Sequence, residues 1–317
     1  MESRGREKGF VTIATGRMEF FIMARNLLLS YRHFTADPLP FAIICDKQNK
    51  YTESFDDVIL LHTAKRSYID KLELTSLAPY DRTIFIDADC LAYRDLNDMW
   101  EVFKDAPPFC VLGDKLTFDQ SYGWFLKEDV GEFSDKISFN IIFHGGAYYI
   151  EPSHPGLVPF RDTVSYIHEH YFDYKFHLFP KPSDEAVFSL ALAVHGFAPA
   201  ARFQDWFCYL PIAVGVKAAP RKGLLNYSYR TKGGNLITIG SGYLLHWGHN
   251  GGLSLFTFQT YLILRLVRND CRAFFNAMNL WLTIVSYKLS RLVKGWMPYS
   301  LKQTLFKYYE YFNKLRR

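Results

Sequence analysis

Short apolar runs alternate with longer amphipathic segments through the first third of the chain. The runs at 9–15, 41–46 and 56–63 are rich in Val, Ile, Leu and Phe, whereas helical patterns occupy 20–34 and 67–80. Strands that are almost wholly apolar and alternate with helices are typical of a parallel sheet covered on both faces. The pattern therefore predicts an α/β fold with a mostly parallel, Rossmann-like central sheet.

The strand pattern continues, less regularly, into the next part of the chain. Further strands are predicted at 83–86, 108–114, 143–152 and 242–247. Between them, 115–140 is mixed in composition and 217–235 is rich in Gly, Lys and Arg. We expect both of these segments to form loops or lids.

Helical periodicity replaces the strand pattern from about residue 255 onward. The last predicted helix has apolar residues at spacings of three and four, which places them on one face. These residues are Met297, Leu301, Leu305, Tyr308, Phe312 and Leu315. We therefore divide the chain into an α/β domain, 1–252, and a helical C-terminal extension, 253–317.

The net charge of +5 is concentrated in that extension. Residues 288–317 contain eight Lys or Arg and one Glu, a net charge of +7, so the rest of the chain sums to −2. Because the body of the protein is near neutral, nucleic acid is not an expected partner. The basic amphipathic tail suits an anionic membrane surface. The alternative is that its apolar stripe packs on the α/β domain.

Cysteine usage and the lack of a spanning segment suggest where the protein is located. The five cysteines are odd in number and form no Cys-x-x-Cys pair, which favours buried free thiols in a reducing compartment. The N-terminal "MESRGREKGF" has no apolar core of a secretory signal. The longest candidate span, 273–287, has 15 residues, whereas a membrane-spanning helix needs about 20. We expect a cytoplasmic protein, soluble or peripheral to a membrane.

Two aspartates follow the strand predicted at 83–86, in the sequence Asp87-Ala88-Asp89. Ligands of open α/β sheets bind beyond the carboxyl ends of the strands. Strand alternation would send both carboxylates to the same side, where they would converge on one point. Bare carboxylates that close repel each other, and a divalent cation between them would remove the repulsion. The alternative is a pair of acids that cap a helix or are solvated in a loop.

Five segments carry a resemblance to a known family. They are "FVTIATG" (10–16), "KLELTSLAPYDRTIFIDADCLAYRDLNDMW" (71–100), "FHGGAYYIEPS" (143–153), "PSDEAVF" (182–188) and "LLHWGHNGG" (244–252). In this order they resemble the glycogenin-like glycosyltransferases, a retaining family with the GT-A fold that includes bacterial lipopolysaccharide galactosyltransferases. The resemblance implies a GT-A fold over about residues 9–252 and a nucleotide diphosphate sugar as the donor.

The resemblance also implies a metal site and a phosphate contact. Asp87 and Asp89 would hold Mn²⁺ or Mg²⁺, with His246 as the third ligand, and an imidazole ligand suits a first-row metal such as Mn²⁺. The metal would neutralise the negative charge that builds on the departing diphosphate. Lys71 would add a positive charge beside the phosphates.

The family implies further contacts with the donor and the acceptor. Ala14 and Thr15, at the end of the first strand, would line the nucleotide pocket, and Ala88 and Gly248 would also contact the donor. Asp184 would lie beside the transferred sugar, where it would orient hydroxyl groups or stabilise developing positive charge. His144 stands where the family usually has an Asn that contacts sugar or acceptor.

Each of these residues has a plainer interpretation when it is considered alone. His246 lies in an apolar strand and would then be a core histidine, and Lys71 would be a solvated helix residue. Asp184 equally suits the first turn of a helix, where the helix dipole favours an acid. Gly145 and Gly146 would simply permit a tight backbone.

The sequence departs from the family pattern at a residue that grips the diphosphate. The family usually has a Lys after the histidine segment, whereas position 252 is Gly here. The residues that are candidates to replace it are Lys217, Arg221, Lys222, Lys232 and His249.

These features together predict a metal-dependent glycosyltransferase. It would move a sugar from a UDP-sugar to a glycan or lipid-linked acceptor, with retention of configuration implied by the resemblance alone. One alternative is a nucleotidyltransferase, although "ATGRMEF" (14–20) offers only Gly16 and Arg17 as a phosphate loop. The other is a catalytically inactive, membrane-peripheral binding protein with the same fold.

Overall fold

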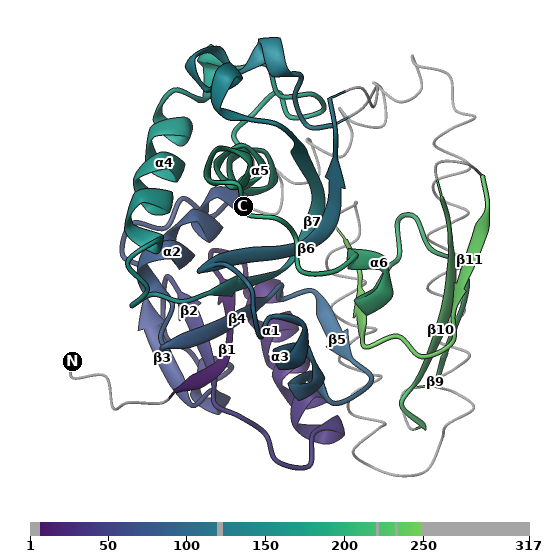
Figure 1. Ribbon diagram of the computed structural model, residues 1–317. Coiled ribbons are helices and arrows are strands. Elements are labelled where there is room, and N and C mark those ends of the chain that lie inside the picture. The colour runs from purple at the N-terminus through teal and green to yellow at the C-terminus, as the bar shows by residue number, and fades with distance from the viewer. Residues whose placement is uncertain (1–6, 119–122, 220–221, 232–233, 249–317) are drawn as a thin grey trace, which may run out of the picture.

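The computed structural model describes residues 7–248, apart from 119–122, 220–221 and 232–233. Its centre is a six-stranded sheet in the order β3-β2-β1-β4-β7-β6 (Figure 1). The strands are β1 (Lys8–Ala14), β2 (Phe41–Cys45), β3 (Asp57–Leu60), β4 (Arg82–Ile86), β6 (Phe109–Leu116) and β7 (Asn140–Ile150). All six were predicted from the apolar runs, and the α/β fold is confirmed.

One strand of this sheet runs against the others. β1, β2, β3 and β4 pair in parallel, whereas β7 is antiparallel to both of its neighbours, β4 and β6. The reversal was not predicted, because a buried strand has the same apolar pattern in either direction. The sheet is mostly parallel, as expected.

The order of the strands defines where a ligand can bind. The chain builds outward from β1 to β2 and β3, and then returns to place β4 on the other side of β1. In open α/β sheets the crevice at such a reversal, beyond the carboxyl ends of the strands, is the usual ligand site. Ala14 ends β1 and Ile86 ends β4 at this edge. The residues that follow these two strands are therefore the candidates for function.

Helices cover both faces of the central sheet (Figure 1). They are α1 (Met18–Phe34), α2 (Leu74–Leu77), α3 (Met99–Val102), α4 (Leu157–Glu169), α5 (Asp184–His195) and α6 (Phe203–Trp206). Because strand side chains alternate between faces, Val11 and Phe85 enter the core shared with α4 and α5, whereas Phe10 and Ile84 enter the core shared with α1 and α3. Both cores exclude solvent and fix the positions of the strand ends.

The helix predicted at 67–80 is shorter than expected and is split in two. Residues Tyr68–Glu73 form a 3-10 helix, which leads directly into α2. The helix ends at Leu77 because Ala78 precedes Pro79 and therefore takes an extended ψ of 124°. Further 3-10 turns lie at Thr52–Ser54, Leu96–Asp98, Lys127–Asp129, Gly131–Lys136 and Tyr171–Asp173.

The segment predicted as a loop at 115–140 is largely irregular but well packed. β6 extends to Leu116, and two 3-10 turns follow the undescribed residues. The side chains of Phe125 and Phe133 are buried in the same core as α4 and α5. The described part of this segment is therefore a wall of the core, and its aromatic content accounts for its burial.

A small second sheet extends the edge of the fold that carries the site. Its strands are β5 (Cys90–Ala92), β12 (Leu244–His246) and β8 (Phe207–Tyr209), in that order. β12 is antiparallel to β5, with His246 paired with Cys90, and parallel to β8. This register brings a residue from the end of the described chain beside the segment that follows β4.

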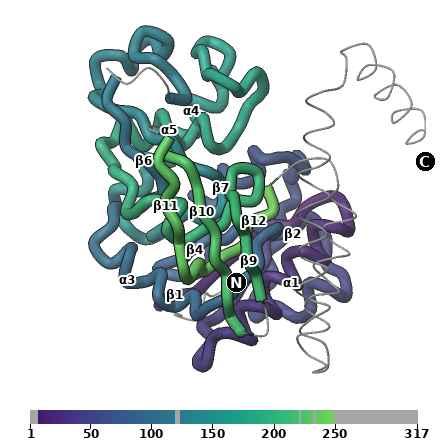
Figure 2. Tube along the Cα trace, turned by 90° about the vertical axis from the view of Figure 1, so that its right-hand side faces the viewer, coloured from purple at the N-terminus to yellow at the C-terminus, as the bar shows by residue number. Residues whose placement is uncertain are grey.

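The prediction of a loop or lid at 217–235 is wrong. β9 (Val214–Ala219), β10 (Leu224–Arg230) and β11 (Leu236–Ile239) form a three-stranded antiparallel sheet that lies across one side of the molecule (Figure 2). Leu225 and Tyr227 of this sheet are buried against Leu245 and Trp247. The described Gly, Lys and Arg residues of this segment lie mainly at turns and exposed positions. The composition of the segment therefore did not reveal strands that bury one face.

Some expectations concern residues that the structure does not describe. The boundary near 252 and the helices of 253–317 lie outside the described residues. Within the part of the chain that the structure describes, no helix is both long and apolar enough to cross a membrane. Cys45, Cys90, Cys110 and Cys208 are buried, as predicted, and no disulfide joins any two of these four. Cys271 lies outside the described part of the chain.

Two adjacent leucines of β10 provide a test of the antiparallel sheet. Leu225 is 0% exposed and Leu224 is 38% exposed. Leu225→Ala should lower the free energy of unfolding by about 2–5 kcal/mol, because it removes core contacts and leaves a cavity. Leu224→Ala should lower it by less than about 1 kcal/mol. Urea unfolding measures both, and equal small effects would contradict the packing of this sheet.

Candidate functional site

The two aspartates after β4 lie in a turn. The backbone N–H of Cys90 donates to the carbonyl of Asp87 at 3.1 Å, which closes a four-residue turn between β4 and β5. The N–H of Asp87 donates to the carbonyl of Gly146 on β7 at 2.9 Å. The expected geometry of strand alternation is therefore wrong, since the strand ends at Ile86. The turn after β4, and not strand alternation, determines the directions in which the two carboxylates point.

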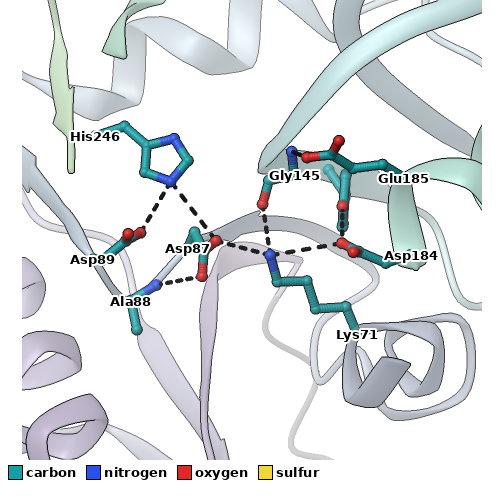
Figure 3. A network of polar contacts seen from close by, with 9 residues as sticks. Lys71, Asp87, Ala88, Asp89, Gly145, Asp184, Glu185 and His246 are labelled. Carbon is teal, nitrogen blue, oxygen red and sulfur yellow. Dashed lines mark hydrogen bonds and ion pairs between the residues drawn. The ribbon is translucent and has the colours of Figure 1, made fainter. Parts of the chain in front are cut away.

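Both carboxylates nevertheless face one side chain, the imidazole of His246 (Figure 3). Its Nε2 lies 3.0 Å from Oδ1 of Asp89 and 3.8 Å from Oδ2 of Asp87. The pairing of β12 with β5 fixes this approach, and the N–H of Trp247 donates to the carbonyl of Asp89 at 3.2 Å. The structure thus brings together the three residues predicted as metal ligands.

Lys71 reaches the same place from the 3-10 helix that precedes β4. Its Nζ donates to Oδ2 of Asp87 at 2.8 Å and to the carbonyl of Gly145 at 2.9 Å, and lies 3.6 Å from Oδ2 of Asp184. Burial alone would lower the pKa of Lys71, but the charges of Asp87 and Asp184 raise it well above its usual range. Lys71 is therefore a buried, fully charged member of the site and is not a solvated helix residue.

Asp184 lies at a helix start, as its plainer interpretation expects, and also belongs to the ion-pair network of Lys71. It is the first residue of α5, and its carboxylate also accepts a hydrogen bond of 2.5 Å from the hydroxyl of Tyr148. The residue is only 2% exposed, so its carboxylate is enclosed between Tyr148 and Lys71. Asp184 holds Lys71 in place, and contact with a sugar would require it to leave these partners.

Gly145 is required where these side chains meet. A Cβ atom at this position would lie 2.8 Å from the hydroxyl of Tyr148, 2.9 Å from Oδ2 of Asp184 and 3.1 Å from Nζ of Lys71. All three distances are shorter than ordinary van der Waals contacts. The glycine that was expected to permit a tight backbone therefore makes room for the ion-pair network.

The charges at the site depend on one another. Burial raises the pKa of Asp87, and the neighbouring charge of Asp89 adds to this effect, although Lys71 opposes it. Burial also acts to raise the pKa of Asp89, but the positive charge of His246 outweighs it and holds this pKa below its usual value. Burial would lower the pKa of His246, yet Asp89 and Asp87 raise it. A proton on His246 thus balances the two carboxylates, and a bound cation would take the place of that proton.

The donor set fits a divalent cation. Oδ1 of Asp89 is buried and lies 3.0 Å from Nε2 of His246, but no hydrogen bond of good geometry joins the two atoms. A cation held by both atoms would satisfy them better than this contact does. One potential ligand atom from each of Asp89, Cys90 and His246 lies within 4.8 Å of the others. Carboxylate and imidazole suit first-row divalent metals. Cys90 was not predicted as a neighbour, because its place depends on the pairing of β5 with β12.

The nucleotide end of the predicted site lies beside β4. Ala14 and Thr15 are buried at the carboxyl end of β1. The hydroxyl of Thr15 donates to Oδ2 of Asp70 at 2.7 Å, and Asp70 also accepts the backbone N–H groups of Lys65 and Arg66. Asp70 was not predicted from the sequence. It ties β1 to the 3-10 helix, and since it immediately precedes Lys71 it also fixes where that side chain begins.

His144 lies one residue before Gly145 and packs among aromatic rings. Its ring centroid is 4.4 Å from that of Tyr209, in a stacked arrangement, and 5.2 Å from that of Phe203. Burial and the positive charge of His246 lower the pKa of His144 to about 4. The imidazole is therefore neutral at pH 7, and it presents one donor and one acceptor.

The remaining predicted residues are placed as follows. Ala88 is buried in the turn between the two aspartates, and its N–H donates to Oδ1 of Asp87 at 2.9 Å. Gly248 follows β12 with a φ of +63°, close against Tyr209. Lys217 and Lys222 are exposed on or beside the antiparallel sheet. The other three candidates to replace the absent Lys lie outside the described residues.

The lowered pKa of His144 predicts how stability depends on pH. The unfolded chain binds a proton near pH 6.5 and the folded chain only near pH 4, so unfolding is favoured as the pH falls through this window. In His144→Gln this contribution should be absent, and the variant should lose less stability than the wild type between pH 7 and pH 4. Urea unfolding in the presence of a chelator measures the difference.

The matched control for this experiment is His62→Gln, which changes an exposed histidine. It should follow the pH dependence of the wild type throughout. An identical pH dependence in His144→Gln would contradict the burial of a neutral imidazole.

Comparisons with known proteins identify similar structures but no similar sequence. No protein-family model and no curated protein matches the chain. Three of the solved structures that are similar to it are glycosyltransferases. The galactosyltransferase LgtC, in complex with donor and acceptor sugar analogues, is 14% identical with a TM-score of 0.43, over 63% of this chain and 74% of that chain. Mouse xyloside xylosyltransferase 1 is 12% identical with a TM-score of 0.41, over 64% and 87%. The bifunctional glycosyltransferase WbbM is 13% identical with a TM-score of 0.45, over 88% of this chain and only 52% of that chain.

At these identities and TM-scores the likeness assigns no activity or residue role to this chain. The matching proteins are glycosyltransferases, which is the class that the sequence resemblance predicts.

Proposed function

We propose that this protein is a metal-dependent glycosyltransferase that moves a sugar from a UDP-sugar to a glycan or lipid-linked acceptor, with retention of configuration. The observation that carries the proposal is the approach of His246 Nε2 to Asp89 and Asp87, at 3.0 and 3.8 Å. These groups stand at the reversal of strand order, beside the buried ammonium of Lys71. An assembly of this kind suits a reaction in which a diphosphate accumulates negative charge as it leaves.

The proposed metal ligands are Asp87, Asp89 and His246. A divalent cation such as Mn²⁺, when bound, would neutralise charge on the departing diphosphate as a Lewis acid. Asp87 would have to divide its carboxylate between this site and Lys71, which it contacts at 2.8 Å. His246 would bind through Nε2, the nitrogen that faces the carboxylates.

The other residues would bind and orient the donor. Lys71 keeps a positive charge beside the phosphates, and its contacts with Asp87 and Asp184 hold it in place before the donor arrives. Ala14 and Thr15 would line the nucleotide pocket at the end of β1, since β1 and β4 are parallel neighbours and end at the same edge. His144, neutral and held by stacking on Tyr209, would offer a hydrogen bond to the sugar or the acceptor.

The two alternative functions make different demands on the site. A nucleotidyltransferase would need a basic, Gly-rich loop after β1, but Arg17 is exposed and pairs with Glu19 at 3.0 Å. A binding protein without activity would bind the nucleotide and leave the donor intact. Incubation with UDP-sugars and measurement of released UDP separates both alternatives from a transferase.

Nucleotide binding that depends on a metal tests the proposed ligands. UDP and Mn²⁺ together should raise the melting temperature of the wild type, because a ligand at 100 times its Kd stabilises the folded state by about 2.7 kcal/mol. UDP alone should produce a much smaller shift. Asp89→Asn should abolish the part of the shift that needs the metal.

The matched control for this experiment is Asp205→Asn, which changes an aspartate whose side chain is 45% exposed and lies on α6. It should respond to UDP and Mn²⁺ as the wild type does. An undiminished shift in Asp89→Asn would show that the metal is held elsewhere, or that none is needed.

We also propose that the basic segment 288–317, which lies outside the described residues, brings the enzyme to an anionic membrane surface. Each basic side chain near such a surface contributes about 1 kcal/mol. Removal of these residues should abolish sedimentation with vesicles that contain anionic lipid, while activity on a soluble acceptor survives. Unchanged sedimentation of the truncated protein would refute this proposal.

A further inference from the structure

The metal-binding groups that lie together in the structure differ by one residue from those that the sequence predicted. Among the described residues, one ligand atom from each of Asp89, Cys90 and His246 lies within 4.8 Å of the other two. Asp87 does not belong to this group. Its Oδ2 lies 2.8 Å from Nζ of Lys71 and 3.8 Å from Nε2 of His246. A thiol therefore stands where the sequence predicted a second carboxylate.

Strand pairing fixes the place of this thiol. Cys90 begins β5 and is paired with His246 of β12, and directly opposed residues of two antiparallel strands project their side chains to the same face. Asp89 immediately precedes Cys90, in the turn that the N–H of Cys90 closes by donating to the carbonyl of Asp87 at 3.1 Å. The strand pair and the turn together hold the sulfur beside the imidazole and the carboxylate.

The three groups are enclosed and have few other partners. Cys90 is 1% exposed and His246 is 5% exposed, whereas the side chain of Asp89 is 17% exposed. The way in from solvent therefore passes the carboxylate of Asp89. Among the described residues, Asp89 forms an ion pair with His246 alone, whereas Asp87 is held by Lys71. A cation that enters here meets Asp89, Cys90 and His246 before it can recruit Asp87.

From this arrangement we infer that Asp89, Cys90 and His246 form a zinc site that excludes Asp87. One sulfur, one imidazole nitrogen and one carboxylate oxygen belong to the ligand types that zinc takes, and three protein ligands leave its fourth position open. A thiolate favours zinc over the harder Mn²⁺. The open position would lie on the side of Asp89, where water or a phosphate oxygen would fill it.

The spacing of the three groups is within reach of a tetrahedral zinc ion. Zinc lies about 2.3 Å from a thiolate and about 2.0–2.2 Å from nitrogen or oxygen ligands, so that its ligand atoms are roughly 3.3–3.8 Å apart. Oδ1 of Asp89 and Nε2 of His246 lie 3.0 Å apart, which is close to this spacing. The sulfur of Cys90 has to approach by no more than about 1.5 Å. On binding, the thiol proton and any proton on the imidazole pass to water.

Zinc at this place would inhibit the enzyme, and this part of the inference rests on the proposed function. Zinc would occupy Asp89 and His246, which are two of the three proposed ligands of Mn²⁺, so the two metals exclude each other. Asp87 would stay paired with Lys71. Because the thiolate holds zinc more tightly than it holds Mn²⁺, zinc should stop the release of UDP even when Mn²⁺ is in large excess.

Binding of a metal to the thiol can be measured without any assay of activity. Co²⁺ takes the place of zinc in such sites, and its bond to a thiolate gives a charge-transfer band in the near ultraviolet. Co²⁺ added to the metal-free, full-length protein should produce this band, and one equivalent of Zn²⁺ should remove it. In Cys90→Ala the band should be absent, and competition with a chromophoric chelator should show zinc affinity lowered by at least about 100-fold.

The matched control for this experiment is Cys45→Ala, which removes another buried thiol at the end of β2. It should keep the band and the zinc affinity of the wild type. A band of full strength in Cys90→Ala would place the cobalt on a different thiol and overturn the inference.

A measurement on the wild type keeps the inference testable if Cys90→Ala does not fold. Anomalous diffraction at the zinc absorption edge, from a crystal soaked in Zn²⁺, should locate the ion between Cys90 and His246. Asp89 should be its third protein ligand, and Asp87 should remain on Lys71. Zinc that binds elsewhere, or that is held by Asp87 in place of Cys90, would overturn the site.

Inhibition is tested separately, by release of UDP from the UDP-sugar that the wild type uses fastest. With Mn²⁺ present, the zinc concentration that halves the rate should be about 100-fold higher in Cys90→Ala than in the wild type. Equal values in the two proteins would overturn the inhibitory role of the thiol. If the wild type releases UDP from no UDP-sugar, the proposed function fails, whereas the zinc site is still decided by the cobalt band and the diffraction.

Discussion

The ammonium group of Lys71 lies between two carboxylates that belong to different parts of the fold. Asp87 follows β4 and Asp184 begins α5, and the carbonyl of Gly145 on β7 completes the contacts of the ammonium. Since breaking a buried ion pair commonly costs about 3–5 kcal/mol, these three contacts lock the strand end, the helix start and β7 into one arrangement. The network is also the place proposed for the donor, so in that proposal stability and function depend on the same charge.

Most of the fold could be predicted because buried strands have a simple signature. Six apolar runs correspond to the six strands of the central sheet. The direction of β7 could not be predicted, because it leaves no trace in an apolar pattern. The antiparallel sheet was missed for another reason. In β10 the polar Asn226 and Ser228 alternate with Leu225, Tyr227 and Tyr229, which is a strand signal, but the glycines of this segment suggested a loop.

For the candidate site, the sequence identified residues better than it identified their geometry. Asp87, Asp89, Lys71 and His246 converge, but they do so through a turn and through strand pairing between distant segments. Cys90 and Glu185 were missed, although each directly follows a residue that was predicted, Asp89 and Asp184. The backbone N–H of Gly145 donates to Glu185. This contact arises from the tertiary structure, so the sequence alone does not show it.

The pairing of β12 with β5 also has a consequence for how the protein folds during its synthesis. His246 is delivered by nearly the last described residues, whereas Asp89 comes from the first third of the chain. A growing polypeptide on the ribosome would thus contain the acids long before the imidazole that accompanies them. Contacts of such wide sequence separation form slowly, because the intervening chain must first be ordered. Cation binding at this place would then favour only polypeptides whose assembly is complete.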